Sequence, residues 1–167
     1  MSIIHPARLR NRQYLWYMKT IFDKATRDDL INRIIALDEN STAQWGKMNL
    51  HQMLRHCTLW EDLPQGRLHL KQEFLGKIFG KFAWWATMRN DRPFDKNVPA
   101  SPEVQVKEPV TVNVAEEKKK WISLIEAYPH LSAAHSIMHP FFGKLNRDQV
   151  GRLAYKHTDH HLRQFNA

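Results

Sequence analysis

The sequence has few of the features that mark secreted or membrane-spanning proteins. Its 167 residues include one cysteine, Cys57, so no internal disulfide can form and a reducing cytoplasm is the expected compartment. No apolar run approaches the roughly 18 residues that a membrane span needs. The first residues are basic but contain no continuous apolar segment, which argues against a secretory signal.

Several common catalytic and binding motifs are also absent. Thr158 follows His157, so the HExxH motif with its glutamate base is missing, and no glycine-rich nucleotide-binding or nucleophile-elbow motif occurs. The formal charge of +8 predicts attraction to anions. No recognisable nucleic-acid-binding motif accompanies this charge, so nucleic acid is not an expected partner.

What the sequence does contain is four helical segments with explicit start signals. In each, a residue that can cap a helix is followed three positions later by a polar residue, and apolar residues then recur at helical spacing. These pairs are Thr26 with Asp29, Asn49 with Gln52, Asn113 with Glu116, and Asn146 with Gln149. Four amphipathic helices in a chain of ordinary globular composition predict an all-α four-helix bundle.

The connection between the second and third of these helices is long, from about Leu63 to Val112. Such a crossover can join parallel neighbours, so an up-down-down-up order is favoured. Within it, residues Phe74 to Arg89 are predicted to form an extra amphipathic helix. We expect this helix to cover the bundle and expose its lysines, which argues against a membrane partner. Its aromatic and basic composition leaves a membrane-surface or partner-binding role as an alternative.

Two histidines of the last helix, His157 and His161, straddle the centre of its apolar face. Residues four apart on a helix lie about 5–6 Å from each other at Cβ, so two imidazoles can reach one ion. The alternative is a pair of core histidines that are satisfied by hydrogen bonds. Two adjacent buried imidazoles each need a hydrogen-bond partner, and protonating either one is unfavourable in a buried site. A metal ion bound by both rings removes that difficulty.

A third ligand has to come from another helix. His56 lies in the middle of the second helical segment, on the same flank as Gln52 and Trp60. It is about 90° from the apolar centre of that helix, so it should face a groove between helices. This position is compatible with a metal ligand but does not by itself require one. Cys57 points into the apolar stripe and is interpreted as a small core residue.

Two segments, WGKMNLHQMLRHC at residues 45–57 and HPFFGKLNRDQVGRLAYKHTDHHLRQF at residues 139–165, resemble the DinB-like or YfiT-like metal-binding superfamily. The similarity is greatest to a branch of unknown function and covers the chain from Met18 onward. It implies a four-helix bundle with a three-histidine site, in which His56, His157 and His161 match the ligand positions. Residues 18–167 are therefore expected to form one domain, with residues 1–17 as an N-terminal extension and Met18 as an alternative start.

The resemblance also implies a cofactor and a class of reaction. Members of the superfamily bind zinc, nickel or a similar divalent ion, and some transfer low-molecular-weight thiols. Side chains expected to support the ligands or contact a small-molecule substrate are Gln52, His139, His160 and Gln164. Members are often dimers, which leaves a homodimer open.

Two functions for the metal site follow from this interpretation. The first is a metal-dependent enzyme, a thiol S-transferase or a hydrolase-like enzyme, because three protein ligands leave a coordination position for a thiol or water. The second is a non-catalytic stress-response bundle in which the ion only stabilises the fold. The sequence does not name a substrate.

Overall fold

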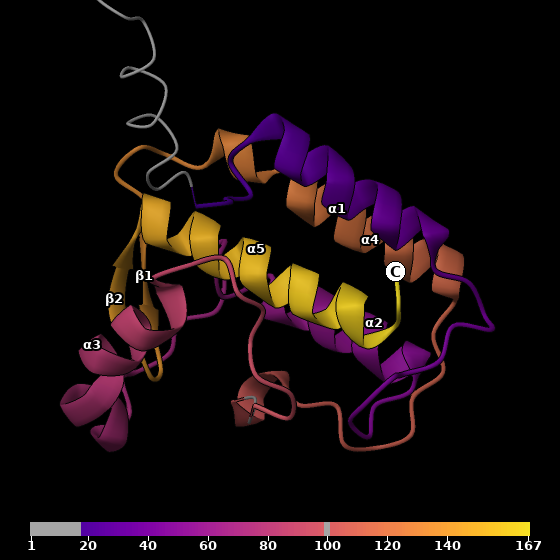
Figure 1. Cartoon of the computed structure of the whole chain (residues 1–167), viewed down its shortest axis with the longest axis horizontal. Coiled ribbons are helices and arrows are strands. Elements are labelled where there is room, and N and C mark those ends of the chain that lie inside the picture. The colour runs from indigo at the N-terminus through magenta and orange to yellow at the C-terminus, as the bar shows by residue number, and fades with distance from the viewer. Residues whose placement is uncertain (1–17, 99–100) are drawn as a thin grey trace, which may run out of the picture.

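The computed structural model describes residues 18–98 and 101–167 (Figure 1). Over these residues the chain is mostly helical, as predicted, and it also contains a small two-stranded sheet. No helix in this part of the chain is long and apolar enough to span a membrane. The elements are α1 (Lys24–Ala36), α2 (Leu50–Trp60), α3 (Phe74–Met88), η2 (Pro102–Val104), α4 (Val114–Glu126), η3 (Tyr128–His130), β1 (Ser136–His139), β2 (Gly143–Asn146) and α5 (Arg147–Gln164).

Three of the four predicted helix starts are confirmed. Asn49, Asn113 and Asn146 each cap the helix that follows them, and the caps at Asn49 and Asn146 are complete capping boxes. The predicted start of α1 at Thr26 is wrong, since this helix begins at Lys24 behind the cap Asp23. The Asp23 carboxylate accepts hydrogen bonds from the backbone nitrogen and hydroxyl of Thr26, so the threonine lies inside the first turn.

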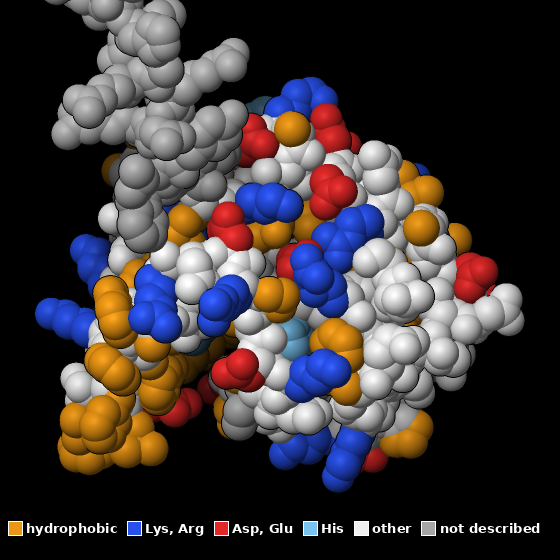
Figure 2. Space-filling view, viewed as in Figure 1, with side chains coloured by type: hydrophobic (Ala, Val, Ile, Leu, Met, Phe, Trp, Pro, Cys, Tyr) orange, Lys and Arg blue, Asp and Glu red, His pale blue; other side chains and the backbone are white. Residues whose placement is uncertain are grey.

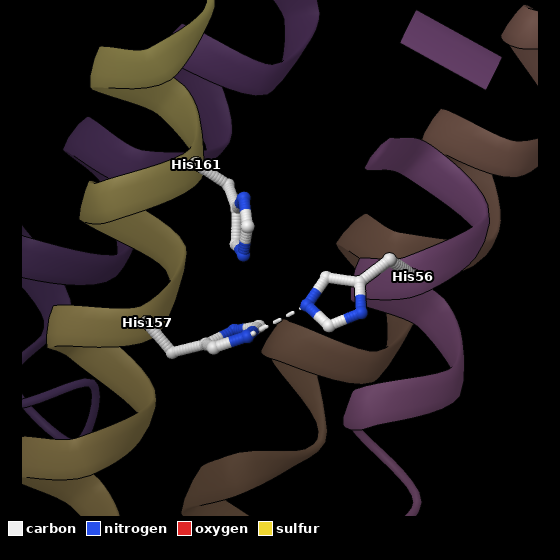
Figure 3. Close-up of side chains that lie close together, drawn as sticks. All are labelled: His56, His157 and His161. Carbon is white, nitrogen blue, oxygen red and sulfur yellow. Dashed lines mark hydrogen bonds between the residues drawn. The ribbon is translucent and has the colours of Figure 1, made fainter. Parts of the chain in front are cut away.

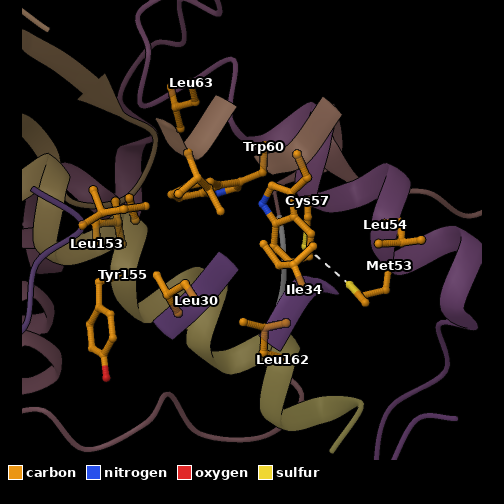
Figure 4. Packing of buried hydrophobic residues seen from close by; sticks show 14 of the residues in the cluster. Leu30, Ile34, Met53, Leu54, Cys57, Trp60, Leu63, Leu153, Tyr155 and Leu162 are labelled. Carbon is orange, nitrogen blue, oxygen red and sulfur yellow. Dashed lines mark hydrogen bonds between the residues drawn. The ribbon is translucent and has the colours of Figure 1, made fainter. Parts of the chain in front are cut away.

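Four of the helices enclose the hydrophobic core. Helix α4 packs against both α1 and α2, and α5 contacts the same two helices from the other side (Figure 1). The core between them is built from almost completely buried side chains, and Figure 4 shows Leu30, Ile34, Met53, Leu54, Cys57 and Leu162 among them. Trp121 and Ile125 of α4 belong to the same core. Cys57 is thus a core residue, as predicted, and burial followed by the charge of Glu61 raises the pKa of its thiol well above the usual value.

A buried ion pair fixes α5 against α1. Asp159 is 3% exposed, and its carboxylate accepts hydrogen bonds from Arg33 of α1 at 2.8 Å and from Arg163 at 2.7 Å. The Arg33 guanidinium also donates to the carbonyl oxygen of the C-terminal Ala167. Because Asp159 lies between His157 and His161 in the sequence, this pairing sets the rotation that turns both histidines towards α2.

The sheet was not predicted. Strands β1 and β2 form an antiparallel hairpin in which Ile137 pairs with Leu145 and His139 with Gly143. Each strand has four residues, which is too short to produce a clear alternating pattern in the sequence. The Nδ1 of His139 accepts hydrogen bonds from the backbone nitrogens of Phe141 and Phe142, and Gly143 closes the turn with a φ of +81°.

Helix α3 exists where it was predicted, but the expectation that it covers the bundle with its apolar side is wrong. It stands beside the hairpin (Figure 1), and its last turn reaches α5, where the Lys156 ammonium donates to the carbonyl of Thr87. Its buried residues are Gly76, Gly80 and Met88, and the two glycines bring the helix backbone close to the main chain at Pro140 and Phe141. Six large apolar side chains of α3 point into solvent instead.

This close approach makes the effect of a glycine substitution predictable. Alanine normally stabilises a helix by about 1 kcal/mol relative to glycine. In Gly76→Ala, however, the new Cβ would lie 2.5 Å from the carbonyl oxygen of Phe141. We expect thermal or denaturant unfolding to show a loss of about 1–3 kcal/mol; a gain in stability would contradict the described packing of α3.

Candidate metal centre

Three histidine side chains from two helices converge on one point. His56 comes from the middle of α2, and His157 and His161 come from successive turns of α5 (Figure 3). The Nε2 atoms of His56 and His157 are 3.2 Å apart, and one nitrogen from each of the three rings lies within 4.8 Å of the others. The sequence-predicted ligands are therefore brought together by the fold.

The outward-facing nitrogen of two of these rings is occupied by a fixed hydrogen-bond acceptor. His56 Nδ1 lies 2.6 Å from the carbonyl oxygen of Val104, and a carbonyl can only accept, so Nδ1 carries the proton. Gln164 donates its amide Nε2 to the carbonyl of Trp45 at 2.9 Å, which turns its Oε1 towards His161 Nδ1, also at 2.9 Å. Both imidazoles are thereby held as the tautomer whose Nε2 presents a lone pair to the centre.

The third ring is held by stacking. The indole of Trp60 lies parallel to the imidazole of His157, with ring centroids 3.8 Å apart and an interplanar angle of 8°. Trp60 follows His56 by one turn of α2, so the two side chains project from the same face of that helix. Helix α2 thus supplies one candidate ligand and also the surface on which a second one rests.

Desolvation favours the neutral form of all three imidazoles. His56 and His161 are 3% and 6% exposed, and His157 is half-buried. Desolvation is the largest cause that lowers the pKa of His56, and it lowers the pKa values of His157 and His161 well below 6.5, with the neighbouring histidines adding to the shift. Neutral imidazole is the form that binds a metal ion.

The donor set fits one cation better than it fits a closed hydrogen-bond network. With Nδ1 protonated on His56 and His161, their two Nε2 lone pairs can receive at most one hydrogen, the Nε2 proton of His157. The cluster therefore supplies no proton to one of the two acceptors, whereas a cation could accept both lone pairs at once. A tetrahedral ion with bonds of about 2.0–2.1 Å separates its nitrogen ligands by about 3.3 Å, close to the spacing already present between His56 and His157.

One protein-family profile matches most of the chain. The profile described as "Protein of unknown function (DUF1569)" matches residues 19–167. The chain belongs to the DUF1569 family. No curated protein and no solved structure matches it.

In this DUF1569 chain, two of the four expected supporting residues lie beside the three histidines. Gln164 contacts His161 directly. His160 is half-buried, and its ring packs against those of His161, Trp45 and Phe94.

The other two expected residues, Gln52 and His139, form hydrogen bonds with groups other than the three histidines. Gln52 completes the cap of α2 and donates to the carbonyls of Val106 and Glu108, so its amide holds the crossover. His139 accepts the two turn hydrogen bonds of the hairpin, and burial lowers its pKa to about 4.

Sequence reasoning included Gln164 but missed the main-chain groups that orient the ligands. The Val104 carbonyl belongs to the 3-10 turn of the crossover, and the Trp45 carbonyl belongs to the loop before α2. Main-chain atoms leave no signal in a sequence. The sequence placed Trp60 on the same helix face as His56, but it did not predict that the indole would stack on His157.

The buried histidines predict how stability depends on pH in the metal-free protein. Their folded-state pKa values are lowered, so the unfolded chain binds more protons below pH 6.5. We therefore expect the free energy of unfolding to be highest above pH 6.5 and to fall with decreasing pH, by up to about 1.4 kcal/mol per pH unit for each histidine. Urea unfolding at several pH values measures this slope.

Two substitutions test whether the three histidines are the cause. His157→Leu removes one of the titrating histidines. The free energy of unfolding should then depend less steeply on pH, by up to about 1.4 kcal/mol per pH unit. His69→Gln is the matched control, because His69 is exposed and lies outside the cluster. An unchanged slope in His157→Leu would contradict the assignment.

Proposed function

We propose that the protein binds one divalent metal ion through the Nε2 atoms of His56, His157 and His161. The observation that carries this proposal is the occupation of the two outer nitrogens by Val104 and Gln164, because it leaves lone pairs that converge. Zinc or nickel suits a set of neutral nitrogen donors without a carboxylate or thiolate. Three protein ligands leave at least one coordination position open.

We further propose that this DUF1569 chain is a member of the DinB-like superfamily, with the four-helix bundle in up-down-down-up order. The packing of α1, α2, α4 and α5 around one core supports this relationship, as does the long crossover between α2 and α4. So does the position of the three histidines on the second and last of these four helices.

Our preferred function is that of a metal-dependent enzyme that acts on a low-molecular-weight thiol. When bound, the ion would act as a Lewis acid that lowers the pKa of a thiol or water ligand. One cation near His160 supports an anionic substrate: the exposed Lys96, whose ammonium lies 4.7 Å from the ring centroid of Trp45. It would attract a carboxylate-bearing thiol such as glutathione.

Elemental analysis of the purified protein tests the metal site. We expect about one equivalent of a divalent ion in the wild type and a loss of most of it in His56→Ala, His157→Ala and His161→Ala, because each variant removes one of three ligands. His69→Ala should keep its metal, since that side chain is exposed. Equal metal content in all of these variants would rule out the proposed ligands.

An assay of thiols against an electrophile separates the two functions of the site. Metal-dependent turnover that is lost in His157→Ala supports the enzyme. If no thiol is turned over but chelation lowers the melting temperature, the ion has a structural role, which is the non-catalytic alternative.

The support of His161 by Gln164 can be tested separately. Gln164→Leu removes the acceptor for Nδ1 while leaving all three ligands in place, so metal affinity should fall about 10–100-fold in a competition titration. Gln44→Leu is the control, since Gln44 is exposed and only its backbone contacts Gln164. If both variants bind the ion as tightly as the wild type, Gln164 does not orient the ligand.

A further inference from the structure

Helix α3 presents an apolar stripe to solvent that nothing in the described residues covers. Each of its six large side chains is more than half exposed (Phe74 73%, Leu75 57%, Ile78 56%, Phe79 53%, Phe82 69%, Trp85 54%). Figure 2 shows hydrophobic side chains gathered in one lobe, at the place that α3 occupies in Figure 1. A contiguous patch of this kind on a small protein marks a site of interaction.

The direction of the stripe is set by the way in which α3 is attached. At 100° per residue, Gly76, Gly80 and Met88 define the face towards the hairpin, and the six apolar side chains centre on the opposite face. The glycine face contacts the backbone at Phe141, and Trp84 packs edge-on against the ring of Phe142. This attachment holds the stripe outward, so it cannot turn into the core without losing these contacts.

The charges beside the stripe are mainly positive. Lys77 and Lys81 lie one turn apart on one flank of α3, and Lys144 is exposed on the adjoining strand β2. Arg89 follows the last turn and lies over the ring of Trp85 at 5.0 Å. No acidic residue occurs between Phe74 and Met88, and the exposed N-cap Glu73 lies just before the stripe. The surface therefore combines protruding aromatic and aliphatic side chains with a cationic flank.

We propose that α3 docks this protein on the surface of a bilayer that contains anionic lipids. The helix would lie in the plane of the interface, with the stripe entering the boundary between headgroups and acyl chains and Lys77 and Lys81 facing the lipid phosphates. With 15 residues, α3 is too short to span the hydrocarbon core, so it lies on the membrane and does not cross it. This role is independent of the metal site.

The charge pattern favours a lipid surface over a second copy of the chain. In a two-fold dimer the same face meets itself, so the lysine flank of α3 would meet a second lysine flank, with the N-cap Glu73 as the acidic side chain beside it. An anionic bilayer supplies counter-charges along the whole flank. The stripe is also formed by side chains that project from one isolated helix, a shape that enters a fluid interface without needing a matching groove.

Co-sedimentation of the full chain with vesicles tests this proposal. We expect binding to vesicles of phosphatidylcholine mixed with phosphatidylglycerol, and much weaker binding to phosphatidylcholine alone. Phe82→Asp should weaken binding about tenfold or more, because it places a charge where the wild-type ring would enter the lipid interface. The double variant Lys77→Gln and Lys81→Gln should lose about 20-fold in affinity for the anionic vesicles only.

The matched control is Ile35→Asp, which replaces an apolar side chain of α1 that is 57% exposed. It should bind like the wild type, and circular dichroism should show that every variant is folded. The proposal fails if Phe82→Asp and Ile35→Asp bind alike, or if binding does not depend on anionic lipid. It also fails if, in sedimentation velocity without lipid, Phe82→Asp converts a dimer into a monomer, since a second copy would then occupy the stripe.

Discussion

The convergence of three imidazoles on one largely buried point is the constraint on which the rest of this structure depends. His56 and His161 are almost completely buried and His157 is half-buried, so their ring nitrogens need partners from the protein or from a bound ion. The fold satisfies the outer nitrogens of His56 and His161 with the Val104 carbonyl and the Gln164 amide. The inner nitrogens are left with more lone pairs than protons, and a cation resolves that imbalance.

Several features far apart in the sequence serve this arrangement. The crossover brings a 3-10 turn back over α2, which places the Val104 carbonyl against His56. The loop before α2 turns at Gly46, whose φ of +82° and missing side chain leave room for Gln164. The ion pair of Asp159 with Arg33 sets the rotation of α5. The proposed centre thus depends on long-range contacts as much as on its ligands.

The parts of the structure that could be predicted were those with a local signal. The capping boxes at Asn49 and Asn146 gave the helix starts, and the spacing of His157 and His161 placed both on one helix face. The hairpin was missed because its strands are short. The outward orientation of α3 could not be predicted, because hydrophobic periodicity assigns the buried face to the large apolar side chains. In the structure, close backbone contact at the two glycines decides which face is buried. Main-chain carbonyls such as that of Val104 carry no sequence signal at all.

X-ray absorption at the edge of the bound metal tests the central claim most directly, because it reports the ligands themselves. The account predicts three imidazole nitrogens at about 2.0–2.1 Å and at least one further light-atom ligand that exchanges with added thiol or solvent. One imidazole should be lost in His157→Ala. A spectrum with fewer than three imidazoles in the wild type, with sulfur from Cys57, or without change in His157→Ala would contradict it.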